Sequence, residues 1–167
     1  MRQAGLSLVE LMVVVLLIGI LALLSTPLTS SWINGARVGE TLGALEQAVG
    51  HAKAAALRNP AAVQGDMAAS VVCVSPEGVL SVRSATPAVA PNPVAAATCA
   101  AGGMVLWTTQ LHSSVNITLD PSDDDWSCGC FTNKGVLTTA GANCLACSSN
   151  LDLKVSAGDQ DDERKFY

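Results

Sequence analysis

Cysteines are the residues of this sequence that most readily offer chemistry. The last four, spaced C-x-C and C-x-x-C, could place four thiolates around a zinc ion. The first of these pairs lacks the usual C-x-x-C spacing, however, and thiols in an exported protein tend to oxidise. We therefore expect disulfides, no metal site and no cofactor, with the pairing left open by the sequence. The six cysteines are Cys73, Cys99, Cys128, Cys130, Cys144 and Cys147.

Other clusters of reactive side chains indicate no catalytic site. His51 and His112 stand apart from any credible nucleophile. The chain has neither a phosphate-binding glycine-rich loop nor a nucleophile elbow. The acidic run 120–125 could bind calcium, but it lacks the spacing of a calcium loop. We expect a solvated turn there, and a protein that is not an enzyme.

Glu10 is the only ionisable side chain in an apolar run from Leu6 to Leu28. This run is long enough to cross a hydrocarbon core about 30 Å thick. A carboxylate at that depth costs about 2.5–3.5 kcal/mol on insertion scales, so it usually has a partner. Cleavage between Gly5 and Leu6 would supply one, because the new amino terminus lies nearby on the same or a neighbouring subunit. An out-of-step subunit would then leave both charges unpaired.

Two other interpretations of this N-terminal segment are a signal peptide and a plain membrane anchor. An ordinary signal peptide is cleaved after its apolar stretch, near small residues. Here the apolar run leads directly into a helical pattern, and the polar leader before Gly5 is very short. A plain single-pass anchor with a chance glycine and glutamate is the remaining alternative.

The stretch from Gly5 to Met12, GLSLVELM, resembles the prepilin-peptidase motif of type IV pilins and type II secretion pseudopilins. The resemblance implies that the peptidase cuts after Gly5 and methylates the new N-terminus at Leu6. It implies that Glu10, fifth in the mature chain, acts in filament assembly. Pro27 falls where many members carry a helix-kinking proline. Leu6 departs from the family's usual phenylalanine.

A second resemblance covers the end of the predicted helix and a late turn. Residues 45–58 are similar to the stalk-end pattern of the GspH/FimT group of minor pilins and pseudopilins. Residues 131–135 are similar to that group's aromatic-x-x-x-Gly turn. The resemblance implies an α+β, pilin-like fold, in which a long N-terminal helix packs on a C-terminal antiparallel β-sheet domain.

The periodicity of apolar residues predicts how the helix is divided. We expect a leader at 1–5, a transmembrane and filament-core half at 6–28, an amphipathic stalk at 29–59, and a disulfide-braced β-rich domain at 60–167. The proline after Asn59 should end the helix, and the backbone should kink or melt near 25–27. The buried stripe of the stalk should comprise Val38, Leu42, Leu45, Val49, Ala52 and Ala56.

Short β-prone runs separated by turn residues follow the stalk. Residues 86–103, rich in alanine and proline, predict a long surface loop that Cys99 ties down. Gly35, Gly39 and Gly43 recur every fourth residue, and we expect them to pack against the protein's own sheet in preference to another subunit. The predicted strands are 70–74, 79–83, 104–109, 115–119, 135–139 and 151–155.

The formal net charge of −5 disfavours nucleic acid as a partner. The expected partners are other pilins or pseudopilins, a prepilin peptidase and an inner-membrane assembly platform. The expected location is the inner membrane, crossed once, with the C-terminal domain in the periplasm and later in a filament. Three roles follow: a minor pilin near a pilus tip, a type II secretion pseudopilin, or a DNA-uptake receptor. The last would need Arg164 and Lys165, which acidic residues crowd.

Overall fold

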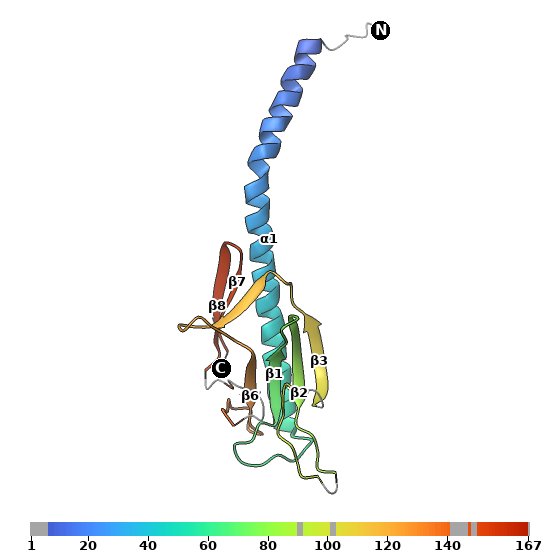
Figure 1. Ribbon diagram of the computed structural model, residues 1–167, viewed down its shortest axis with the longest axis vertical. Coiled ribbons are helices and arrows are strands. Elements are labelled where there is room, and N and C mark those ends of the chain that lie inside the picture. The colour runs from blue at the N-terminus through green and yellow to red at the C-terminus, as the bar shows by residue number, and fades with distance from the viewer. Residues whose placement is uncertain (1–6, 90–91, 101–102, 141–146, 148–149, 167) are drawn as a thin grey trace.

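The computed structural model describes residues 7–166 apart from 90–91, 101–102, 141–146 and 148–149, and it does not describe the side chains of 24–28. One long helix, α1 (Leu8–Arg58), is followed by two antiparallel sheets. The N-terminal half of α1 projects beyond the sheets, and its C-terminal half lies along them (Figure 1). The predicted α+β, pilin-like layout is confirmed.

The two ends of α1 are set by local capping. Ser7 is extended, with φ −74° and ψ 149°, so the helix begins two residues after the predicted start at Leu6. At the other end Asn59 adopts the left-handed conformation, and its N–H donates to the Ala55 carbonyl at 3.0 Å. The Asn59 side chain also accepts from the Val63 N–H at 2.8 Å. The predicted helix end at Asn59 is confirmed.

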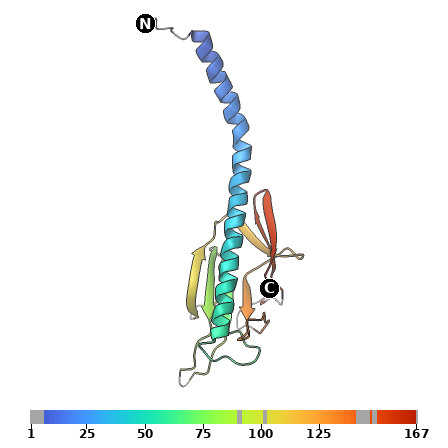
Figure 2. The ribbon, with the colours of Figure 1, turned by 180° about the vertical axis from the view of Figure 1, so that it is seen from behind.

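The backbone of α1 remains helical through Pro27, so of the two predicted outcomes near 25–27, a kink or local melting, melting is wrong. A proline removes only one N–H donor from a helix, and the flanking residues here keep the helical conformation. Figure 2 shows a gently curved helix without a sharp break.

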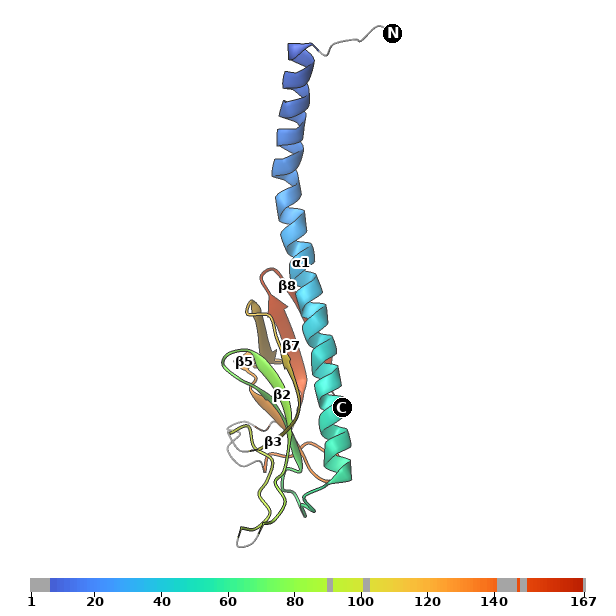
Figure 3. The same ribbon diagram turned by 90° about the vertical axis from the view of Figure 1, so that its right-hand side faces the viewer.

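The first sheet has the strand order β3-β2-β1-β6 and the second β5-β4-β7-β8. Figure 3 shows that both sheets lie on the same side of α1. All strand pairs are antiparallel. The strands are β1 (Ser70–Val74), β2 (Val79–Ser84), β3 (Met104–Gln110), β4 (Val115–Leu119), β5 (Asp124–Asp125), β6 (Cys128–Phe131), β7 (Asp152–Ala157) and β8 (Gln160–Lys165).

Five of the six predicted strands are present, within one or two residues at their ends. The sixth, 135–139, is wrong, because only the single bridge between Phe131 and Leu137 forms there. Gly135 has φ +73°, a conformation that turns the chain. Strands β5, β6 and β8 were not predicted, since β5 is acidic, β8 is charged after Gln160, and β6 lies in a cysteine-rich stretch.

The predicted stripe of α1 forms one wall of the hydrophobic core. All six positions, from Val38 to Ala56, are buried. On the facing sheet, the Ser70 hydroxyl donates to the Ala52 carbonyl at 2.7 Å. The His51 ring stacks on Trp107 with centroids 5.8 Å apart. The core therefore fixes the rotation of α1 relative to the first sheet.

The glycine repeat does not pack as predicted. A Cβ built on Gly39 or Gly43 would meet no atom within 4 Å, and one built on Gly35 would meet only the Gln160 side chain at 3.9 Å. The helix turns Val38 and its partners toward the sheets instead, which leaves the adjacent glycine positions in open space.

Candidate functional site

The N-terminal half of α1 presents apolar side chains to its surroundings on every side. Every large hydrophobic residue from Leu8 to Leu23 is 47–78 % exposed. A helix that is apolar all round is normally covered by other apolar groups. Within the part of α1 whose side chains are described, no stretch combines the length and the apolarity that crossing a membrane requires.

Glu10 lies in this half and closes a capping box with Ser7. The Ser7 N–H donates to Glu10 Oε2 at 3.2 Å, and the Glu10 N–H donates to Ser7 Oγ at 3.2 Å. Each group thereby satisfies one of the free donors at a helix N-terminus. The capping box was not predicted, although its S-x-x-E spacing is visible in the sequence.

The capping box points the Glu10 carboxylate back toward the start of the chain. Ser7, from whose N–H the carboxylate accepts, is the second residue after the predicted cleavage site. Gly5, Leu6 and the amine that cleavage would create lie outside the described residues. The backbone of Pro27 is helical, and its side chain lies outside the described part of the structure.

Disulfides, and no thiolate cluster, account for the described cysteines. Cys73 is bonded to Cys99, and Cys130 is bonded to Cys147. Cys128 is also disulfide-bonded, and Cys144 lies outside the described residues. With Cys128, Cys130 and Cys147 oxidised, the four-thiolate zinc alternative is excluded.

Three of these cysteines share one face of the first sheet. Cys73 on β1 pairs in register with Cys128 on β6, and Val71 pairs with Cys130. Ser70 points toward α1, and side chains alternate along a strand, so Val71 and Cys73 point away from the helix. The disulfides therefore bind two loops to the outer face of β1 and β6.

The loop held by Cys99 is further fixed by backbone hydrogen bonds. The Ala97 N–H donates to the Ala68 carbonyl at 2.8 Å, and Thr86 pairs with Ala95. The β2–β3 connection to which they belong reaches the end of the molecule farthest from the N-terminus (Figure 1). The predicted surface loop tied by Cys99 is confirmed. The disulfide-braced face thus belongs to the first sheet, which lies along the C-terminal half of α1 (Figure 1).

At the end of the domain opposite the β2–β3 connection, the tip of the β7–β8 hairpin is bound to α1. Asn34 donates to Asp159 Oδ1 at 3.2 Å, and Gln160 donates to Ser31 Oγ at 3.1 Å. The Asn34 hydrogen bond is the main cause that lowers the pKa of Asp159. Gly158 makes the turn with φ +60°, and a Cβ there would lie 2.4 Å from the Asn34 amide nitrogen. Only glycine allows this close approach.

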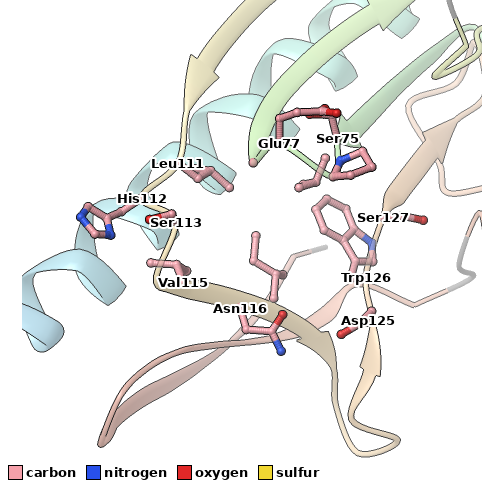
Figure 4. A pocket seen from close by; sticks show the side chains of 14 residues that line it. Ser75, Glu77, Leu111, His112, Ser113, Val115, Asn116, Asp125, Trp126 and Ser127 are labelled. Carbon is pink, nitrogen blue, oxygen red and sulfur yellow. The ribbon is translucent and has the colours of Figure 1, made fainter.

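A pocket of about 660 Å³ opens between the two sheets (Figure 4). The β1–β2 turn, the β3–β4 connection and Asp125 to Ser127 line it. Trp126 is buried at its side, and a hydrogen bond from Ser75 lowers the pKa of Glu77 at its rim. The His112 ring lies at the edge, within 2.9 Å of Ser114 Oγ. The residues that line the pocket include both apolar and polar groups, and they form no recognised catalytic arrangement.

Basic side chains near the C-terminus are paired with acidic ones. Arg164 forms an ion pair with Glu46 on α1. Lys165 lies 3.2 Å from the Asp152 carboxylate. These pairings reduce the positive charge that β8 offers to a polyanion.

Comparison with protein families gives one match, the prokaryotic N-terminal methylation motif over residues 1–26. This motif is the signal of type IV pilins and pseudopilins. It marks membrane-anchored subunits that a peptidase processes and that assemble into filaments. No curated protein and no solved structure matches the chain. The chain therefore combines a pilin signal with a pilin-like layout.

Proposed function

We propose that the chain is a minor pilin, a structural subunit that promotes assembly at or near the tip of a type IV pilus. The observation that carries this proposal is the bare apolar half of α1, which begins with the methylation motif and projects beyond the domain. In a filament, the same half of neighbouring subunits would cover it and remove its apolar surface from water.

The first step is processing at the N-terminus. The peptidase cuts between Gly5 and Leu6, and the new amine is methylated. The Glu10 carboxylate, which the capping box points toward this end, pairs with the amine of a neighbouring subunit during assembly. A charged pair in apolar surroundings is stable only when both partners are in place, so it selects the correct register.

Before assembly, residues 6–28 are held in the inner membrane and the domain from residue 60 onward lies in the periplasm. An oxidising periplasm suits the disulfides of the first sheet. An assembly platform in the inner membrane and other pilins are the partners. The role is structural and not enzymatic.

The disulfide-braced face is suited to exposure at a filament tip. It belongs to the sheet that lies along the C-terminal half of α1, away from the filament-forming half (Figure 1). Covalent links hold its loops against β1 and β6 without need of a thick core beneath them. In a subunit at the tip, these loops would be the part that first meets a surface.

Replacing Glu10 by Ala tests the proposal. Glu10→Ala should remain in the membrane fraction and be lost from sheared filaments. Glu40→Ala is the matched control, since Glu40 is exposed on the stalk outside the apolar half, and it should be incorporated normally. Equal incorporation of both variants would refute the assembly role of Glu10.

A type II secretion pseudopilin is the second candidate, because the methylation motif is common to both classes. Cross-linking in membranes distinguishes them by the partners recovered, which are pilus subunits in one case and secretion pseudopilins in the other. We do not propose DNA uptake, since Arg164 and Lys165 are engaged with Glu46 and Asp152.

A further inference from the structure

The side chain of Trp32 is largely exposed at the point on α1 where the globular domain begins. Trp32 is 77 % exposed, whereas Trp126 is buried and Trp107 stacks on His51. It borders a shallow hollow that Ser31 and Gln160 also line, beside the tip of the β7–β8 hairpin. Most of this indole is therefore left uncovered by the part of the chain that the structure describes.

The position of Trp32 along the helix matches the edge of a bilayer. The run from Leu6 to Leu28 rises about 34 Å at about 1.5 Å per residue, slightly more than a hydrocarbon core of about 30 Å. Trp32 follows Leu28 by about 6 Å along the same helix. The headgroup layer on each side is about 5–8 Å thick, so Trp32 falls within it.

The residues along α1 on either side of Trp32 also change from apolar to charged, as they would across the edge of a bilayer. The unbroken apolar run ends at Leu28, and the first charge after Glu10 is Arg37, about 14 Å beyond Leu28. That distance places Arg37 past the headgroups, in water. An indole has an apolar ring and a polar N–H, which is why tryptophan is enriched at membrane interfaces.

We propose that Trp32 anchors the unassembled subunit in the periplasmic headgroup layer of the bilayer. The inference rests on the proposed membrane-anchored pilin. The lipid surface it suits is zwitterionic, because the acidic side chains of Asp159, Asp161 and Asp162 lie on or beside the same hairpin and would repel anionic headgroups.

Two hydrogen bonds join α1 to the tip of the β7–β8 hairpin, and we call them the hairpin clamp. Because of this clamp, an anchored Trp32 would also fix the distance of the whole domain from the membrane. The two residues of α1 in the clamp, Ser31 and Asn34, lie on either side of Trp32. Fixing Trp32 in the headgroup layer therefore fixes the hairpin tip at the membrane surface. The disulfide-braced face then lies farther from the bilayer than this tip (Figure 1).

Fluorescence quenching in vesicles tests the proposal on the full chain. The protein is reconstituted into phosphatidylcholine vesicles that carry a quencher either at the headgroup or deep in the acyl chains, and insertion is verified by flotation. The headgroup quencher should reduce the emission more than the deep one. Trp32→Phe should abolish this quenchable fraction, and Trp107→Phe, the control, should keep it.

The outcomes separate the inference from the function on which it rests. Failure to float with vesicles would overturn the membrane-anchored function, and the inference with it. Flotation without headgroup quenching, or with stronger quenching by the deep label, would overturn the placement of Trp32 alone. If Trp32→Phe instead reduces incorporation into filaments while lipid quenching is absent, the indole packs on a neighbouring subunit and the lipid anchor is refuted.

Discussion

Removing the Cys73–Cys99 disulfide should lower the free energy of unfolding by about 3.5 kcal/mol. The bond closes a loop with a sequence separation of 26. In the chain-entropy treatment, opening a loop of that length returns this much conformational freedom to the unfolded state at 25 °C. The Cys130–Cys147 bond, with a separation of 17, gives about 3.1 kcal/mol by the same reasoning.

The two loops do not overlap in sequence, so their effects should add. Losing both bonds would cost about 6.6 kcal/mol, a large part of the 5–15 kcal/mol that typically holds a domain folded. The disulfide-braced face would then be the first part of the protein to lose its structure in a reducing environment.

Urea unfolding of the fragment from Ser30 onward, without reductant, measures this loss. The fragment contains the entire core, because every residue of the core cluster lies at or beyond Val38. The Cys73→Ala/Cys99→Ala variant is compared with wild type and with Cys99→Ala alone. The single variant breaks the bond but keeps the buried Cys73 side chain, so it separates cross-linking from packing.

Two results would refute the reasoning. A loss below about 1 kcal/mol in the double variant would mean that the bond does not restrict the unfolded chain as calculated. A much larger loss in the double variant than in Cys99→Ala would assign the effect to the packing of Cys73 and not to the covalent link.

Three further predictions concern the packing of α1. Leu45→Ala should cost about 2–5 kcal/mol in urea unfolding because Leu45 is fully buried, whereas Leu57→Ala, at a site 63 % exposed, should cost less than about 0.5 kcal/mol; equal losses would contradict the described core. Gly158→Ala should lower the thermal midpoint, since its φ is +60° and its Cβ would meet Asn34, and an unchanged midpoint would argue against the clamp. The pKa of Asp159 is lowered chiefly by Asn34, so this contribution to stability is fully present above the ordinary value of 3.8 and is lost as the pH falls through the lower folded value. Asn34→Ala should therefore remove a pH-dependent part of the stability in low-salt unfolding at neutral pH, and a difference from wild type that persists undiminished in strong acid would exclude this origin.

The sequence predicted the elements whose side chains alternate or recur with a clear period. The stalk stripe of α1 and strands such as β1 and β2 bury apolar residues at the expected spacing, and burial makes that spacing visible. The methylation motif was equally readable, because its chemistry depends on contiguous residues.

The strands that were not predicted are stabilised by contacts with segments far away in the sequence, and no local pattern of residues reveals such contacts. β8 reads QDDERK and carries no apolar alternation, yet it pairs with β7 along its whole length and binds α1 through Arg164 and Glu46. The glycine repeat has a clear period, but nothing packs on Gly39 or Gly43. A periodic pattern shows that residues share a helix face and does not show what covers that face.

Disulfide pairing was open for a similar reason. Cys73 and Cys128 are direct neighbours across β1 and β6, yet Cys73 is bonded to Cys99. Each bond described here joins a strand to a loop, and the reach of a loop follows from the tertiary fold. Spacing along the chain could therefore not choose among the possible pairs.

Folding of the domain and assembly into a filament depend on different parts of this chain. Among the residues whose side chains are described, none of the core cluster precedes Val38, and the apolar side chains from Leu8 to Leu23 contribute nothing to it. Substitutions in that half should therefore change filament incorporation without changing the stability of the domain. The hairpin clamp at Ser31 and Asn34 lies between the two parts and, together with the continuous helix α1, links the position of one to the orientation of the other.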